Sequence, residues 1–365
     1  MTACTSSTEA PAGDPEPTAA ETGDEDEVVV ETETPEEWAQ YQANLKFALD
    51  YKPKCPVTKT GRPRVIVSGY GRFMSNATNT TGQIISRLIP GAKYPVTAPP
   101  PYGEVDEPAP QTSVALGSLT LPKTGAVDVC ALILPVSWDL AAILVLKEVA
   151  AFAPDLVIMN GIAGPTQPLW LELGSVNRAM AARDSSDLLA PVEGSPLIPQ
   201  ASQGDLLRGL RMSWGTVKGA AEKAIKAEAK LLDEKGKPLS DVITGGALLA
   251  GFPREGNTYL CNNVAYTVNY LMGYPGRSVR LLKASHPRGN APNGISVKVS
   301  RDHRQTPREF IHWPSTLAGP RHLDAGARIL AAIIDAQLTA QRSSSDRATV
   351  GTNEQAEISA SGDTY

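Results

Sequence analysis

The fold is decided by residues 154–164, which read PDLVIMNGIAG. A short apolar run between a proline and glycines predicts a buried strand that ends in a glycine-bearing loop. The residues just before it, 140–152, predict a helix. Such a strand is typical of an α/β sheet, and the loop that follows it is the usual setting of a functional site in that class.

The same alternation continues on both sides of this stretch. Further strands are predicted at 64–68, 114–119, 128–134, 246–252, 295–299 and 309–314, and further helices at 82–88, 214–232, 261–272 and 323–339. Alternating strands and helices indicate an α/β protein with a single three-layer α/β/α sandwich around a mixed sheet, like those of phosphorylases and hydrolases.

The two ends of the chain differ from its middle in composition. Residues 1–35 predict a disordered acidic tail, since the first 45 residues hold twelve acidic side chains and neither Lys nor Arg. Residues 36–63 predict an amphipathic helix and a linker, because Trp38, Tyr41, Leu45 and Leu49 share one helical face. One folded domain is predicted over residues 64–340, followed by a second disordered tail at 341–365.

Charge and hydropathy exclude two classes of partner. Without the twelve acidic residues of the N-terminal segment, 27 of the 39 acidic residues remain against 34 Lys and Arg. This balance is ordinary for an enzyme. Basic residues do not form a stripe interleaved with aromatic ones, so nucleic-acid binding is not expected. No run approaches the roughly 20 apolar residues that a membrane-spanning helix needs.

The four cysteines, at positions 4, 55, 130 and 261, have neither metal-binding spacing nor the density of a disulfide framework, so no metal is predicted. Cys130 lies in an apolar run and is expected in the core, whereas Cys55 precedes a proline and is expected to be exposed. Cys4 and the Ser/Thr/Pro-rich tether after it resemble the end of a bacterial lipoprotein signal, although the hydrophobic stretch of such a signal is missing.

Cys261 has a reason to be a reactive nucleophile. It follows a predicted strand and a turn at 253–257, and it begins a segment in which Val264, Val268 and Leu271 have helical spacing. At a helix N-terminus, unpaired N–H groups and the helix dipole favour a thiolate. The alternative is an inert buried cysteine, which is the commoner role of a lone cysteine in apolar surroundings.

His312 is the candidate base among the four histidines. It lies in an apolar strand that is stopped by Pro314, and a strand of this kind delivers a side chain to the edge of a sheet. His286 and His303 lie among polar loop residues, and His322 is expected at the surface near a helix cap. The alternative for His312 is a hydrogen-bonded structural histidine.

Glu172 is the candidate for the group that orients the histidine. It stands between two leucines, so burial and a polar partner are expected. The alternative is an amphipathic edge strand with Glu172 on its solvent-facing side.

Several segments together resemble the pyroglutamyl peptidase I family, cysteine exopeptidases that remove an N-terminal pyroglutamate. The resemblance spans roughly residues 64–320 and keeps the family's order of Glu, Cys and His. It is carried by Gly69–Phe73 with Asn79, by residues 154–164, by Leu171 and Glu172 with Asn177, by Tyr259–Asn262, and by Phe310–Pro314.

The resemblance implies that residues 64–340 form a catalytic domain with Cys261 as nucleophile, His312 as acid and base, and Glu172 as its orienting carboxylate. It implies a peptide substrate with an N-terminal pyroglutamate and no cofactor, and it allows a homo-oligomer. A cytoplasmic location is implied as well; the alternative is an exported lipoprotein anchored through Cys4. The side chains expected around the lactam ring are Tyr70, Phe73, Asn79, Tyr259 and Leu260.

The chain departs from the family pattern near this expected pocket. Arg72 replaces a proline, Met74 and Ser75 replace two glycines, and Asn257 replaces another. We expect Arg72 to point away from the neutral lactam, toward solvent, a nearby carboxylate or the peptide beyond the scissile bond. Two other interpretations stay open, a nucleoside phosphorylase-like transferase and a non-catalytic binding protein on the same fold.

Overall fold

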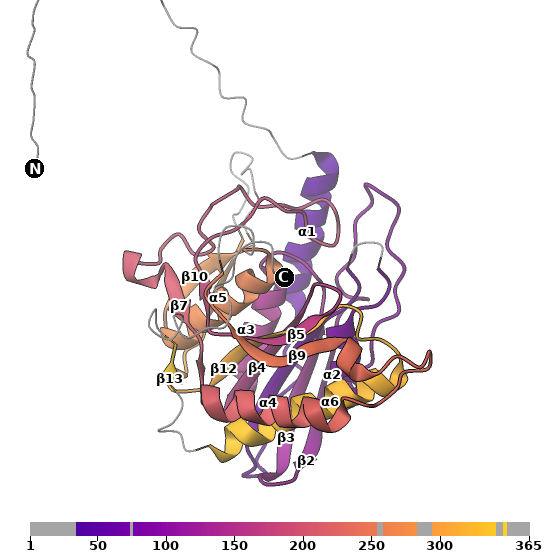
Figure 1. Cartoon of the computed structure of the whole chain (residues 1–365). Helices are drawn as coiled ribbons and strands as arrows, with labels where there is room; N and C mark the ends of the chain where they lie inside the picture. Colours follow the sequence, from indigo (N-terminus) through magenta and orange to yellow (C-terminus); the bar gives the residue numbers. More distant parts are fainter. Residues whose placement is uncertain (1–33, 74–75, 254–257, 283–293, 341–345, 349–365) are drawn as a thin grey trace, which may run out of the picture. The chain divides into compact units, whose positions relative to one another are not determined.

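The computed structural model describes residues 34–73, 76–253, 258–282, 294–340 and 346–348 (Figure 1). The tails predicted at 1–35 and 341–365 therefore fall almost wholly outside the described residues, and so do Cys4, Met74, Ser75, Asn257 and His286.

A nine-stranded mixed sheet forms the centre of the protein. Its main path runs β13-β8-β12-β4-β1-β3-β2, and β5 pairs with both β12 and β9. The four inner strands β3, β1, β4 and β12 are parallel, whereas β2, β5 and β8 run antiparallel to the inner strands they join. The strands are β1 (Arg64–Tyr70), β2 (Ser113–Leu121), β3 (Gly125–Leu134), β4 (Leu156–Ala163), β5 (Gln167–Glu172), β8 (Arg211–Met212), β9 (Ile243–Ala250), β12 (Arg308–Pro314) and β13 (Asp346–Arg347).

Two further pairs of strands stand apart from this sheet: β6 (Gly174–Val176) with β7 (Leu207–Gly209), and β10 (Ser278–Leu281) with β11 (Ile295–Lys298). The strand predicted at 295–299 is thus present as β11, but it pairs with β10. Two single-turn 3₁₀ helices lie at Gln203–Asp205 and Leu239–Asp241.

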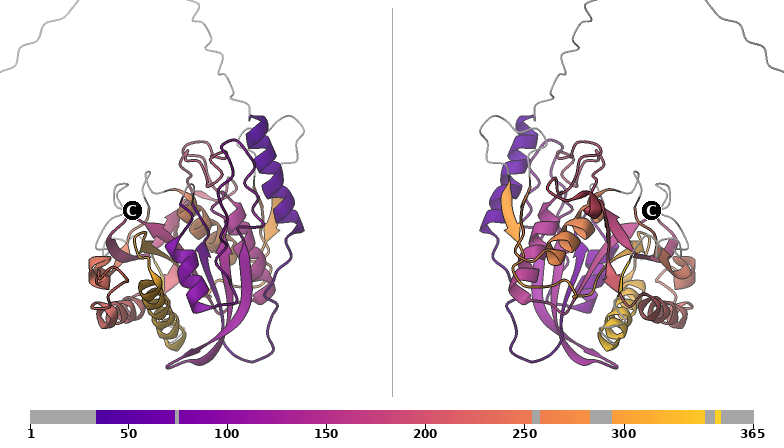
Figure 2. Two further views of the ribbon diagram at one scale, coloured as in Figure 1. Left: turned by 90° about the vertical axis from the view of Figure 1, so that its right-hand side faces the viewer. Right: turned by 90° about the vertical axis from the view of Figure 1, so that its left-hand side faces the viewer.

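Helices cover both faces of the central sheet, as Figures 1 and 2 show, and the predicted three-layer α/β/α sandwich is confirmed. One face is covered by α1 (Pro35–Asp50), α3 (Leu140–Phe152) and α5 (Leu260–Gly273). The other is covered by α2 (Thr80–Leu88), α4 (Trp214–Glu228) and α6 (Pro320–Thr339). Helix α4 ends four residues earlier than its pattern predicts.

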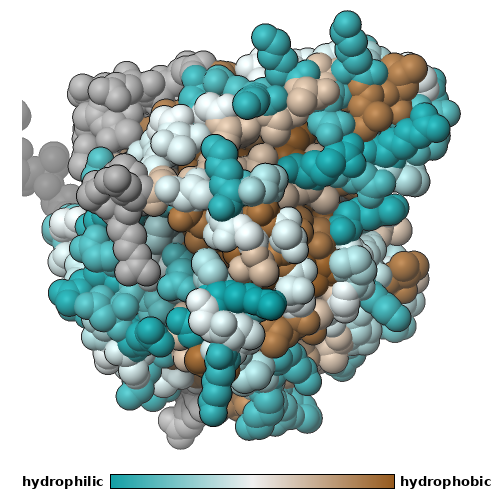
Figure 3. All heavy atoms as spheres, turned by 90° about the horizontal axis from the view of Figure 1, so that it is seen from below, coloured by the Kyte–Doolittle hydropathy of each residue, from teal (hydrophilic) through white to brown (hydrophobic). Residues whose placement is uncertain are grey.

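Among the described residues, no helix combines the length and the apolar character needed to cross a membrane. Seen from below, hydrophilic side chains frame smaller areas where hydrophobic ones reach the surface (Figure 3).

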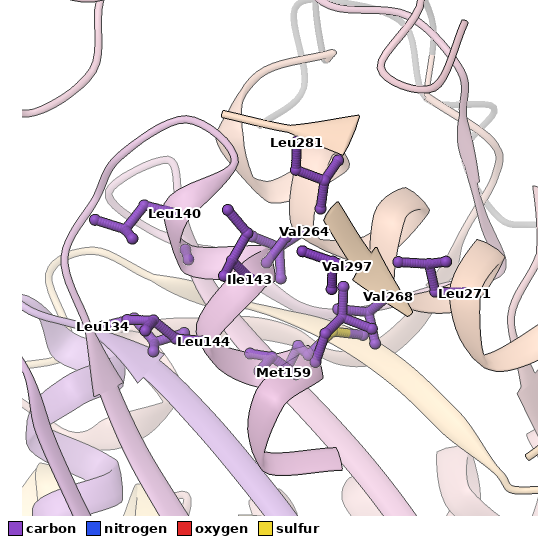
Figure 4. Close-up of a cluster of buried hydrophobic side chains, with 14 of the residues drawn as sticks. Leu134, Leu140, Ile143, Leu144, Met159, Val264, Val268, Leu271, Leu281 and Val297 are labelled. Carbon is purple, nitrogen blue, oxygen red and sulfur yellow. The ribbon is translucent and has the colours of Figure 1, made fainter. Parts of the chain in front are cut away.

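The core on the α3 and α5 face joins elements from distant parts of the chain. Side chains of β3, β4, α3, α5 and the β10–β11 pair converge there (Figure 4). Helix α3 is buried nearly all round, which explains why its sequence is apolar without a polar stripe. It ends at Ala153, which adopts a left-handed conformation (φ 52°), and Pro154 then prevents its continuation. The stretch that follows becomes β4, as predicted.

Two histidines lie deeper than their sequence context predicts. His303 is buried, and its Nδ1 lies 3.1 Å from Oγ1 of Thr306. Burial, with Arg301 and Arg308 nearby, lowers the pKa of His303 to about 4. His322 is also buried, with Nε2 3.1 Å from the carbonyl oxygen of Leu231. The predictions of a solvated loop and a surface position were therefore wrong, because tertiary contacts cover both rings.

The prediction of an exposed Cys55 was also wrong. Cys55 is fully buried and forms a disulfide with Cys130 of β3, which lies in the core as predicted. Glu148 of α3 lies beside the disulfide and accepts hydrogen bonds from the backbone N–H groups of Lys54 (2.7 Å) and Cys55 (3.0 Å). The linker after α1 is thereby bound covalently to the central sheet. The two sulfurs and Glu148 also form a group with metal-ligand spacing, but the disulfide occupies both sulfurs.

Removing this disulfide should destabilise the protein. Replacing Cys55 and Cys130 together with alanine should lower the free energy of unfolding by about 2–4 kcal/mol, because the bond closes a long loop in the unfolded chain. Urea unfolding of the variant and the wild type measures the difference. Peptide mapping without reductant should find the 55–130 link, and two free thiols at these positions would contradict the structure.

Candidate active site

Two adjacent strands and one helix bring the predicted chemical groups together. His312 lies on β12 and Glu172 at the end of β5, which pairs antiparallel with β12. Cys261 is the second residue of α5, after Tyr259 at the N-cap. The thiol is therefore at a helix N-terminus, as its sequence context predicts, and α5 packs on the face of the sheet that carries His312.

The histidine and the glutamate form a buried pair. Nδ1 of His312 lies 2.9 Å from Oε1 of Glu172, and both side chains are buried. Glu172 is not on a solvent-facing edge. Burial by itself disfavours a charged imidazole, but the Glu172 carboxylate and Cys261 outweigh it and raise the pKa of His312 to about 10. An imidazolium at this position is held by the carboxylate on one side.

The Cys261 sulfur lies on the other side of the imidazole. The His312 ring is hydrogen-bonded to the sulfur, so carboxylate, imidazole and sulfur follow one another. A base beside a thiol, itself oriented by a third group, is the arrangement that activates a cysteine nucleophile. Cys261 is partly exposed, and it is the one cysteine among the described residues that is outside a disulfide.

Gly161 makes room for the sulfur. A Cβ at this position of β4 would lie 2.7 Å from Sγ of Cys261 and 2.9 Å from the ring of Phe310, both too close for any side chain. The sequence predicts a glycine-bearing loop at this point, but Gly161 lies within β4. The reason for a glycine here lies in the approach of α5 to the sheet, which no local pattern encodes.

Asn262 fixes the start of α5. Its side chain accepts a hydrogen bond from the N–H of Val176 (2.9 Å) and donates to the carbonyl oxygens of Val176 (2.9 Å) and Arg178 (3.0 Å). The neighbouring Cys261 is thereby held against the sheet. Asn262 belongs to a segment that carries the family resemblance, but no role was predicted for it. The available signal was an amide side chain at the start of an apolar helix.

Three of the predicted pocket residues are aromatic, and two of them, Tyr70 and Tyr259, lie near Cys261. Tyr70 ends β1 and is buried. The ring of Tyr259 lies edge-on to Phe73, with centroids 6.2 Å apart, and to Trp138, with centroids 5.5 Å apart. The Tyr259 hydroxyl donates to the carbonyl oxygen of Arg183, so this ring is held at both ends.

The other two predicted pocket residues make structural contacts. Asn79 is the N-cap of α2, where its side chain accepts hydrogen bonds from the N–H (3.0 Å) and the hydroxyl (2.8 Å) of Thr81. Leu260 is buried in the core beside α3. A direct role of these two residues in substrate binding stays a prediction.

Arg72 points to a carboxylate, one of the three orientations expected for it. It is almost fully buried and pairs with buried Asp106, which also accepts a hydrogen bond from Nε2 of Gln111 (2.6 Å). The backbone of Asp106 is bound in turn by Gln40 of α1, through its N–H (2.7 Å) and its carbonyl oxygen (3.0 Å). This network connects the residues before Phe73 to the first helix.

Breaking the Arg72–Asp106 pair should cost about 3–5 kcal/mol, because Asp106→Ala leaves a buried guanidinium without its partner. The double variant Arg72→Met/Asp106→Leu should lose clearly less, since it leaves no unpaired charge. Urea unfolding of the two variants provides the comparison. Equal losses of unfolding free energy in the two variants would contradict a buried ion pair whose members need each other. A loss below ~1 kcal/mol for Asp106→Ala would contradict it as well.

Comparisons with known proteins find only distant structural similarity. No family model matches the chain, and no curated protein matches it. Among solved structures, it is similar to pyroglutamyl peptidase I of Bacillus amyloliquefaciens, at 15% identity and a TM-score of 0.46, over 76% of this chain and 98% of that one. It is also similar to the pyrrolidone carboxyl peptidase of Thermococcus litoralis, at 16% identity and a TM-score of 0.44, over 76% and 93% of the two chains.

Proposed function

We propose that the protein is a cysteine exopeptidase that hydrolyses an N-terminal pyroglutamyl residue from peptides. The observation that carries the proposal is the sequence of contacts from Glu172 through His312 to the sulfur of Cys261. Neighbouring members of this group are more than 50 positions apart in the sequence, and their juxtaposition supports a common chemical role.

In the first half of the reaction, the Cys261 sulfur attacks the carbonyl carbon that joins pyroglutamate to the next residue. The C–N bond then breaks, and the His312 imidazolium gives its proton to the leaving amine. The products are a thioester on Cys261 and a shortened peptide. Glu172 keeps Nδ1 of His312 engaged, so that the other ring nitrogen faces the sulfur.

In the second half, water attacks the thioester while His312 takes its proton. The thioester C–S bond breaks, pyroglutamic acid is released, and the thiolate–imidazolium pair is regenerated. Backbone N–H groups in the first turn of α5 supply part of the stabilisation of the oxyanion in both halves. His312 thus gives one proton to the leaving amine and takes one from water, so the proton balance of the cycle closes.

The aromatic side chains beside the thiol suit a flat, neutral lactam. Phe73 and Tyr259 offer ring edges and faces. The charged side chain next to Phe73 in the sequence, Arg72, is paired with Asp106. An apolar aromatic surface favours a cyclised N-terminus over a charged amine. The possible homo-oligomer and the absence of nucleic-acid partners remain predictions.

The disulfide fits an exported protein better than a cytoplasmic one. Disulfides persist in oxidising compartments and are rare in the cytosol. The buried Cys55–Cys130 bond therefore supports the alternative drawn from Cys4. Trapping of thiols in living cells tests this directly, since a cytoplasmic protein would carry both cysteines reduced.

A panel of amide substrates tests the function. The purified wild type should release the fluorophore from a pyroglutamyl coumarylamide and leave prolyl and glutaminyl coumarylamides intact, and iodoacetamide should abolish the release. Phosphate-dependent cleavage of a nucleoside that survives iodoacetamide would favour the transferase interpretation. Binding of a pyroglutamyl peptide without turnover would favour the binding protein.

A further inference from the structure

Three neighbouring strands, β1, β4 and β12, each have one residue at the level of the thiol. The register of β4 with β12 pairs Gly161 with His312. The register of β1 with β4 pairs Ser68 with Met159, and two residues further along these parallel strands are Tyr70 and Gly161. Since neighbouring strands lie about 4.8 Å apart, Tyr70 and His312 come from the strands on either side of Gly161.

Tyr70 faces the same side of the sheet as the catalytic groups. Ile66 and Tyr70 of β1 belong to the core that contains α5, and so does Phe310, whose ring lies 5.0 Å from that of His312. The sulfur of Cys261 lies above Gly161. The thiol is thus flanked by the imidazole on one side and by the tyrosine on the other.

The Tyr70 hydroxyl is buried and has no hydrogen-bond partner among the described residues. A buried polar group without a partner costs about 1–3 kcal/mol, and a phenylalanine would fill the same space without that cost. Burial raises the pKa of Tyr70 well above its ordinary value, and the nearby Cys261 and Glu172 raise it further. The phenol therefore keeps its proton and acts as a hydrogen-bond donor.

We infer that the Tyr70 hydroxyl donates a hydrogen bond to the carbonyl oxygen of the scissile bond as that oxygen becomes an oxyanion. The inference rests on the proposed function and adds a catalytic residue to it. The carbonyl that Cys261 attacks is the one substrate group that gains negative charge beside the sulfur. A donor placed opposite the imidazole stabilises that charge without competing for the proton that His312 moves.

Kinetics of Tyr70→Phe test the inference. The variant should lose about 10²-fold in kcat on a pyroglutamyl amide with little change in KM, because an oxyanion donor acts in the transition state. Its thermal stability should match or exceed that of the wild type, since it removes an unpaired hydroxyl. Tyr266→Phe is the matched control: its hydroxyl donates to the carbonyl oxygen of Asp205 (2.8 Å), outside the site, so kcat should stay unchanged.

An aldehyde analogue of pyroglutamate provides a second readout. It forms a hemithioacetal with the thiol, and its oxygen then takes the position of the oxyanion. Tyr70→Phe should weaken inhibition by the aldehyde but not by 2-pyrrolidinone, which lacks the reacting carbonyl.

An unchanged kcat, or a raised KM with unchanged kcat, would overturn the role of Tyr70 while leaving the proposed function intact. A wild type that hydrolyses no pyroglutamyl amide would overturn both.

Discussion

Replacing Cys261 with serine should abolish hydrolysis of pyroglutamyl amides, with a loss of about 10³-fold or more in kcat. An alcohol at neutral pH lacks the nucleophilic strength of a thiolate, so the imidazole beside it cannot compensate. Steady-state kinetics with a fluorogenic amide give the loss directly.

The fold should survive this change, because serine is close to cysteine in volume and the sulfur makes no disulfide. Circular dichroism and urea unfolding provide that control. Near wild-type turnover in Cys261→Ser would show that another group performs the chemistry, and the cysteine hydrolase proposal would be wrong.

Replacing His312 with alanine should cost about as much as losing the nucleophile, whereas Glu172→Gln should cost roughly one to two orders of magnitude less in kcat. In the proposed reaction, His312 moves the proton in both halves, while Glu172 acts through the orientation and charge of the imidazole. The two variants are compared in the same amide assay. A larger loss for Glu172→Gln than for His312→Ala would reverse the assigned roles.

The Glu172–His312 pair should also change how stability depends on pH. The folded pKa of His312 is raised to about 10 from an ordinary 6.5, so its contribution is full below pH 6.5 and is lost as pH rises toward 10. Glu172→Gln removes the carboxylate that raises this pKa, and the decline in unfolding free energy over that window should become shallower. An unchanged decline would mean that the pair is not ionised.

Most of the fold was predictable because it depends on local patterns. Residues 154–164 carry a buried strand with proline before it and glycine after it, and the structure places β4 there, in the interior of the sheet. Helix α3 was predictable from its apolar run. The separate pairing of β11 with β10 was not, because the pattern of a strand does not specify its neighbour.

The predicted catalytic groups also came together. Cys261 and His312 stand near the ends of elements predicted from the sequence, whereas β5, which carries Glu172, was not among the predicted strands. The residues that escaped prediction depend on contacts between distant parts of the chain. Cys55 and Cys130 are 75 residues apart, and Arg72 and Asp106 belong to different loops. The need for Gly161 arises only where α5 meets β4.

The central claim is that Cys261 becomes acylated by the pyroglutamyl group, and rapid acid quenching followed by peptide mass mapping measures this most directly. A pyroglutamyl ester, whose acylation outpaces hydrolysis of the thioester, is mixed with the wild type and quenched before a full turnover. We expect one pyroglutamyl group on the peptide that contains Cys261, and none in the Cys261→Ser variant. Turnover with the group attached to another residue, or with Cys261 never modified, would contradict it.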